Sequence, residues 1–176
     1  NTYTIGDNVA YSVVPKMRRD GQIKLLDNAG ANSLTVQFES GDFNFSPSKD
    51  AEVIIRDRHA ISNVRRGDQE ASATGSFTIF MREFTDSAQA GSVMDFVNKT
   101  GSYASNVSTG STGTPRIEEY CIDIEYTAEG TDNGDDADHK ATLSKCICNV
   151  VFTEGDPSTL AINFTCYGGV VYTGPA

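Results

Sequence analysis

The sequence predicts a mainly β, antiparallel protein with one helix and one long extended segment. The first observation is residue choice: the 176 residues include 13 Val, 11 Ile and 17 Thr but only 5 Leu. β-Branched residues suit a pleated sheet, whereas Leu favours helices. The second is that apolar and polar residues alternate along several segments, which is the period of a half-buried strand. The length suits one domain spanning 1–176.

The N-terminal segments predict a hairpin followed by a bent strand. Apolar-rich runs at 9–16 and 22–26 flank Asp20-Gly21, a dipeptide that favours a tight hairpin turn. A further strand is expected over 33–45, with Gly41 as the position of a bend or bulge.

The middle of the chain combines a charged excursion with a strand. Residues 46–50 are predicted to form a loop, and residues 56–70 carry many charges of both signs. Mixed charge of this kind is typical of solvated surface or of a rim that meets a partner. Residues 75–84 predict a strand covered on both faces, with Phe77, Ile79 and Met81 on one side and Phe80 and Phe84 on the other.

One helix is predicted over 87–99, capped by Asp86. Its apolar stripe consists of Ala90, Val93, Met94 and Val97. Gly101 follows as a stop, and the Gly/Ser/Thr-rich residues 101–114 predict a flexible loop.

The C-terminal part, 117–173, predicts a β-meander. Over 117–127, Tyr120, Ile122, Ile124 and Tyr126 share one face, and Glu119, Cys121, Asp123 and Glu125 share the other. This alternation indicates one buried face and one face toward solvent or a polar lumen. Residues 141–152 pair back, the turn lies at 154–157, and 160–166 and 170–172 complete the meander.

Charge excludes one class of function. The chain has 24 acidic and 14 basic residues, a net charge of −10, and residues 101–176 contribute −8 of it through 11 acids and 3 bases. An acidic balance argues against a protein that grips nucleic acid or anionic membrane through a basic surface. No run approaches the ~18–20 apolar residues of a membrane span, so no membrane insertion is expected.

No constellation predicts catalysis or a cofactor. The chain contains no nucleophile elbow, zinc-protease motif or phosphate loop, so we expect no enzyme, no resident metal and no cofactor. The four Cys are interpreted as small apolar side chains packed in a sheet, in preference to disulfides or zinc ligands. The acidic loop 129–138 is either a calcium-binding loop or a solvated hairpin tip.

The order of elements resembles the major tail tube proteins of long-tailed bacteriophages. The matching pieces are Gly75-Ser-Phe-Thr78 leading into 86–99, and Phe152-Thr-Glu-Gly-Asp-Pro157 leading into 160–168. The resemblance extends over most of 34–173. It implies a β-sandwich or split barrel with one flanking helix, which Val93, Met94 and Val97 would pack against the sheet. It also implies six-subunit rings that join sheet edges into a barrel and stack into a tube for DNA ejection.

The resemblance gives two sets of candidate residues. The lumen candidates are Glu119, Asp123, Glu125, Asn163 and Thr165, because an acidic or neutral wall lets DNA pass without binding it; the alternative is an outward solvent face. The candidate ring-stacking loop is 41–66, where Arg56, Arg58, Arg65 and Arg66 would meet acids of the next ring.

The resemblance also names partners. These are further copies of the chain, other tail proteins such as the tip, the terminator and a sheath, and double-stranded DNA passing without specific binding. The expected location is the virion tail, assembled in the host cytoplasm. The alternative function is a virion decoration or host-attachment β-sandwich module.

Overall fold

The computed structural model describes residues 21–28, 30–36, 42–47, 52–57, 60–66, 72–85, 91–111, 118–129 and 138–174. The strands are β1 (Gly21–Leu26), β2 (Ser33–Val36), β3 (Asn44–Pro47), β4 (Glu52–Asp57), β5 (Ala60–Arg66), β6 (Ala73–Phe80), β7 (Ile122–Ala128), β8 (His139–Thr153), β9 (Thr159–Cys166) and β10 (Val170–Thr173). The helices are α1 (Val93–Asn98) and the short 3₁₀ helix η2 (Gly101–Tyr103).

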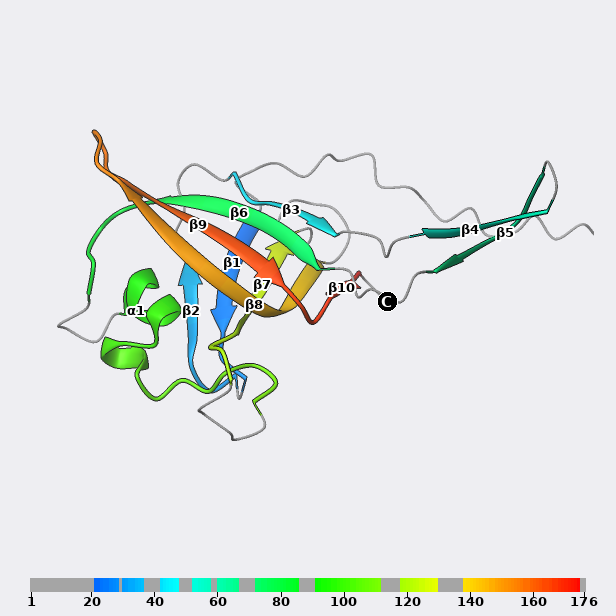
Figure 1. Cartoon of the computed structure of the whole chain (residues 1–176). Helices are drawn as coiled ribbons and strands as arrows, with labels where there is room; N and C mark the ends of the chain where they lie inside the picture. The colour runs from blue at the N-terminus through cyan, green and yellow to red at the C-terminus, as the bar shows by residue number, and fades with distance from the viewer. Residues whose placement is uncertain are drawn as a thin grey trace, which may run out of the picture.

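The mainly β, antiparallel prediction is confirmed. One large sheet runs in the order β2-β1-β7-β8-β9-β6-β3, with β10 also paired to β8, and every pair is antiparallel. Strands β4 and β5 form a separate two-stranded hairpin that extends away from this sheet (Figure 1). The large sheet is curled but open, because β2 and β3 end it without pairing with each other.

Strand β8 connects the two halves of the curled sheet. Its 15 residues pair with β7 and β10 up to about Cys146 and with β9 from there onward (Figure 1). Lys145 has a positive φ of 54°, and the buried positions change phase around it, from Ala141 and Leu143 to Cys146. The irregular residue therefore bends β8 and keeps the core side chains of both halves on one side.

A single core lies inside the curl. Phe77, Ile124, Leu143 and Ile162 come from both halves and are at most 1% exposed. Phe43, which precedes β3, stacks on Tyr126 of β7 with 4.9 Å between ring centroids. This aromatic contact brings one edge of the sheet over the opposite half, because offset-stacked rings bury a large apolar area.

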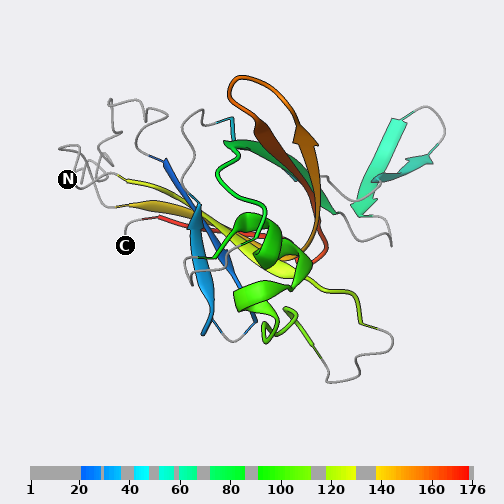
Figure 2. The ribbon, with the colours of Figure 1, turned by 90° about the vertical axis from the view of Figure 1, so that its left-hand side faces the viewer.

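Helix α1 lies against one side of the sheet (Figure 2) and is shorter than the predicted 87–99. It starts after Ser92, whose extended backbone and hydroxyl cap it by accepting a hydrogen bond from the Asp95 N–H at 3.1 Å. The predicted cap, Asp86, lies outside the described residues. Val97 is buried and Val93 and Met94 pack on the core as expected, but the apolar residue of the helix that is fully buried is Phe96.

The expected flexible loop is tied down along its described part, residues 101–111. Asp27 and Asn28, in the turn after β1, bond its backbone: Val107 N donates to Asp27 Oδ2 and Gly110 N to Asn28 Oδ1. Thr109 N donates to the Cys121 carbonyl at 2.8 Å. The side chains of Asp27 and Asn28 therefore hold this segment in place, and its described part is not a free linker.

Other boundaries also differ from expectation. The predicted 33–45 strand comprises β2 and the start of β3, and the 41–66 excursion contains β3 within the main sheet before the β4–β5 hairpin. Strand β6 ends at Phe80, so Phe84 lies beyond it, 47% exposed. The predicted arm 9–16 lies outside the described residues. None of the described helices has the length and apolar character needed to cross a membrane.

Candidate assembly surfaces

The predicted acidic face lies on and beside β7. Ile122 and Ile124 are buried, which confirms the alternation, and Glu119 is exposed just before the strand. Glu125 Oε1 lies 3.2 Å from Lys140 Nζ, and Lys24 is its register neighbour on β1. Bases on both neighbouring strands therefore offset part of the negative charge of this face.

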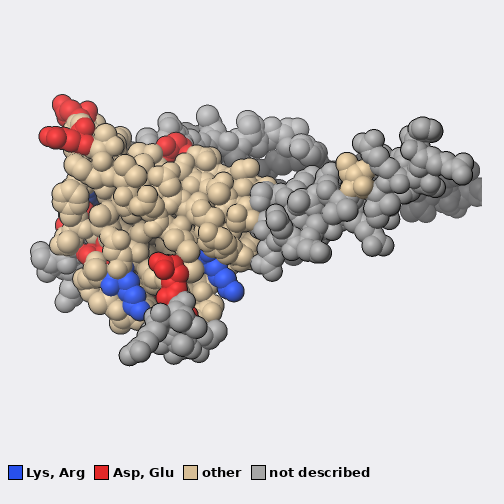
Figure 3. Space-filling model, in the orientation of Figure 1, with Lys and Arg blue, Asp and Glu red and all other residues tan. Residues whose placement is uncertain are grey.

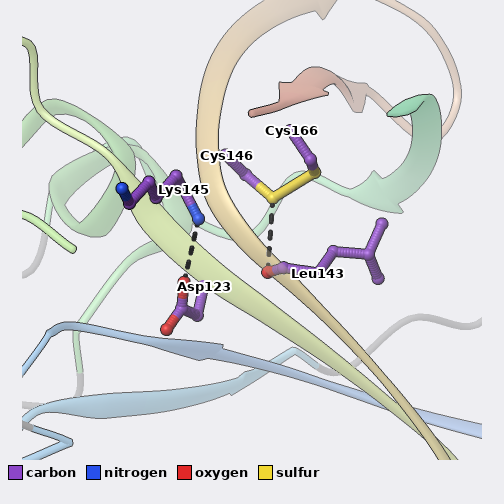
Figure 4. The surroundings of a disulfide bond; sticks show 5 residues. All are labelled: Asp123, Leu143, Lys145, Cys146 and Cys166. Atoms are coloured by element: carbon purple, nitrogen blue, oxygen red, sulfur yellow. Dashed lines mark hydrogen bonds between the residues drawn. A yellow bond between two sulfur atoms is a disulfide. The ribbon is translucent and has the colours of Figure 1, made fainter. Parts of the chain in front are cut away.

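Asp123 has a structural contact inside this face. Its Oδ1 accepts a hydrogen bond from the Lys145 backbone N–H at 3.0 Å, next to the bend in β8 (Figure 4). Burial raises the pKa of the Asp123 carboxyl, and the Lys145 N–H partly opposes that shift. Asp123 thus holds the irregular backbone of β8 in addition to presenting a carboxylate.

A disulfide joins Cys146 to Cys166 immediately beside this bend (Figure 4). Both residues are fully buried in the core, as expected of small apolar side chains, but the preference against a disulfide was wrong. The strand register could have predicted the disulfide. Thr153 pairs with Thr159 across the 154–157 turn, and the same antiparallel pairing continued along both strands places Cys146 opposite Cys166. Directly opposed cysteines on paired strands are close enough for bonding.

The other two cysteines are free thiols. Burial raises the pKa of Cys148 to about 12 and also raises the pKa of Cys121. Because the thiolate is the reactive form, both thiols should react slowly near neutral pH.

Asn163 and Thr165 lie on a different, charge-free surface. A shallow groove of about 540 Å³ runs across β3, β6, β9 and the second half of β8. Its polar lining includes Asn44, Thr74, Ser76, Asn149, Asn163 and Thr165, and none of the described residues that line it is charged. The structure therefore separates the five lumen candidates into a partly neutralised acidic set near β7 and an uncharged set on β9.

The arginine candidates fall on the projecting hairpin. Arg56 lies on β4 and Arg65 and Arg66 on β5, with Glu52 opposite Arg66 in the register. Arg58 lies outside the described residues. The hairpin thus gathers three of the four candidates on one projecting element.

The acidic loop lies between Glu129 and Asp138, and residues 130–137 lie outside the described part of the chain. Within the described residues, no group of three or more His, Cys, Asp or Glu is arranged to hold a metal ion.

An exposed aromatic pair was not predicted. Phe84 and Phe152 meet edge to face with 5.3 Å between ring centroids, although they are 47% and 44% exposed. The alternation of β8 correctly places Phe152 on the side of Cys148 and Val150, but the core ends before it. The distance of a position from the end of the core is not visible in a period-2 pattern.

The comparisons with known proteins concern the fold. No family model and no curated protein matches the chain. Among solved structures, a chain in the cryo-EM structure of the anti-feeding prophage baseplate is 8% identical, with a TM-score of 0.56, and the match covers 94% of this chain and 97% of that one. A chain in the extended sheath-tube complex of the extracellular contractile injection system PVC is 12% identical, with a TM-score of 0.55 and 94% of both chains covered. A chain in the sheath/tube terminator structure of the same system is 14% identical, with a TM-score of 0.54, and 92% and 98% covered. The protein therefore has the fold of chains found in these assemblies.

Proposed function

We propose that this chain is a structural subunit of a phage-tail-like assembly, polymerising as stacked six-subunit rings into a tail tube. The observation that carries this proposal is the extent of the fold match: 92–94% of this chain aligns with 94–98% of chains from contractile assemblies. A match of nearly the whole chain supports a subunit role more strongly than a match of one shared module would.

Unpaired strand edges support lateral assembly. Within the described residues, β2 pairs only with β1, and β8 beyond Cys146 pairs only with β9. Exposed edges favour pairing with another chain, and a closed ring removes them. These two edges are the proposed sites at which neighbouring copies join.

The charge-free groove is our proposed lumen wall. Hydroxyl and amide side chains such as Asn163 and Thr165 carry no charge that would hold or repel phosphates. On the β7 face, by contrast, the carboxylates of Asp123 and Glu125 make contacts within the subunit. In this proposal double-stranded DNA passes along the tube without specific binding, and tip, terminator and sheath proteins are the other partners in the virion tail.

Negative-stain microscopy of the purified protein tests the assembly role. We expect rings of uniform diameter and tubes at high protein concentration. Monomers or trimers that bind a host-surface ligand at every concentration would instead support the decoration or attachment role.

Thiol labelling of assembled tubes tests the lumen wall. In Asn163→Cys, we expect a small maleimide to react but a large polyethylene-glycol maleimide to be excluded. In Glu125→Cys, both reagents should react, and wild-type tubes give the background, which the raised pKa of Cys121 and Cys148 keeps low. Rapid labelling of Asn163→Cys by the large reagent, with exclusion from Glu125→Cys, would place the β7 face in the lumen.

A further inference from the structure

The β8–β9 turn carries an apolar centre that the chain leaves uncovered. Phe152 and Phe84 contact each other there, and they are 44% and 47% exposed. Segment 81–85 is fixed to the turn because Met81 N donates to the Ser158 carbonyl at 2.9 Å. Clustered exposed aromatic residues on a fixed surface are typical of interface centres.

The charged residues around this centre are three acids and one base, Arg82. Glu154 and Asp156 are exposed in the turn, and Glu83 is exposed next to Phe84. Figure 3 shows acidic side chains at this end of the molecule. We name the surface formed by Glu83, Phe84, Phe152, Glu154 and Asp156 the acidic tip. An apolar centre with a charged rim is the usual anatomy of a protein interface.

The opposite end of the molecule carries the complementary chemistry. Residues 52–66 contain four Arg against Glu52 and Asp57, a net formal charge of +2 without His. Ile54 of β4 is 47% exposed, so the hairpin also presents an apolar side chain. Figure 1 shows the β4–β5 hairpin and the β8–β9 turn at opposite ends.

We infer that the acidic tip of one copy receives the β4–β5 hairpin of the next copy along the tube. This inference rests on the proposed tube role and identifies the surface to which the hairpin arginines bind. Arginine suits the site because its guanidinium pairs with carboxylates and stacks on aromatic faces. Since donor and receiver lie at opposite ends, the contact is heterologous and repeats without closing, which generates a filament.

Charge reversal tests the pairing in the full chain. The single variants Glu154→Arg and Asp156→Arg should still form rings. Each should require a protein concentration at least about tenfold higher than wild type to form tubes, because a repulsive contact with the hairpin arginines replaces an attractive one. Asp138→Arg, the same charge change at an exposed acid outside the tip, is the matched control. Combining Asp156→Arg with Arg65→Glu and Arg66→Glu should recover part of the lost tube formation.

The possible outcomes distinguish failure of the hairpin–tip pairing from failure of the proposed tube role. Tube formation by Glu154→Arg and Asp156→Arg at the control's concentration would overturn the pairing, while rings and tubes of wild type leave the tube role intact. Loss of rings in these variants would also overturn it, by placing the tip within the ring. Absence of both rings and tubes in wild type would overturn the tube role itself.

Discussion

At the scale of single residues, Asp123 shows how one side chain serves a structural need on a surface predicted to be functional. Its carboxylate accepts the N–H of Lys145, a residue held at positive φ where β8 bends. Because this hydrogen bond is exposed to solvent, it gives the irregular backbone the modest net stabilisation of an ordinary hydrogen bond. The face of Asp123 could be predicted from alternation, but this contact could not, because it depends on a register shift between β7 and β8.

Asp123→Ala should destabilise the unassembled protein by about 0.5–1.5 kcal/mol, because it removes the exposed hydrogen bond from the Lys145 N–H, which water then replaces. Asp123→Asn keeps an oxygen acceptor and should be as stable as wild type at pH 7 or more so. The pKa of Asp123 is raised in the folded state, so its ionisation lowers stability as pH rises above 3.8 through the folded pKa.

Urea unfolding of both variants and wild type at several pH values measures these effects. The stability of Asp123→Asn relative to wild type should increase as pH rises through that window. A difference between the two proteins that does not change with pH would contradict the assigned burial of the carboxyl.

At the scale of elements, the sequence predicted the β8–β9 hairpin well but did not predict the disulfide within it. The turn at 154–157 and the inward side chains Leu160, Ile162 and Phe164 follow from alternation and turn chemistry. The disulfide was missed because cysteine packing and cysteine bonding both require inward-facing positions. The strand register distinguishes the two cases, because it shows whether two inward-facing cysteines lie directly opposite each other.

The disulfide should stabilise the unassembled protein by about 3 kcal/mol, since it closes a sequence separation of 20 residues. Adding reductant should therefore lower the unfolding midpoint of wild type. The Cys146→Ala/Cys166→Ala variant should start lower and be insensitive to reductant. Thiol titration under denaturing conditions should find two thiols before reduction and four after it; four before reduction would contradict the bond.

For helix α1, the sequence predicted the buried face correctly but not the residue at which the helix begins. The apolar stripe identified Val93, Met94 and Val97 correctly, but the helix begins only after Ser92. Gly91 adopts a φ of 75°, outside helical geometry, and the side chain of Ser92 accepts the Asp95 N–H. Ser and Asp have similar intrinsic preferences for the N-cap position, so cap preference alone did not identify Ser92 as the residue that caps this helix.

At the scale of the whole molecule, fold class followed from composition and periodicity, but the curl of the sheet did not. It depends on contacts between distant segments, such as Phe43 with Tyr126, which no local pattern encodes. It also depends on Gly75: a side chain there would collide with the Asn44 carbonyl and the Phe164 ring. The separation of the lumen candidates into two surfaces is a consequence of this curl.

The opposite placement of the hairpin and the acidic tip has a consequence for how such a tube would end. In a head-to-tail stack, the last ring at one end presents unoccupied acidic tips, and the last ring at the other presents unoccupied arginine hairpins. A protein that caps the first end must offer a basic, apolar projection, whereas one that caps the second must offer an acidic, aromatic socket. No single cap fits both ends, so such a tube would need two chemically different capping proteins.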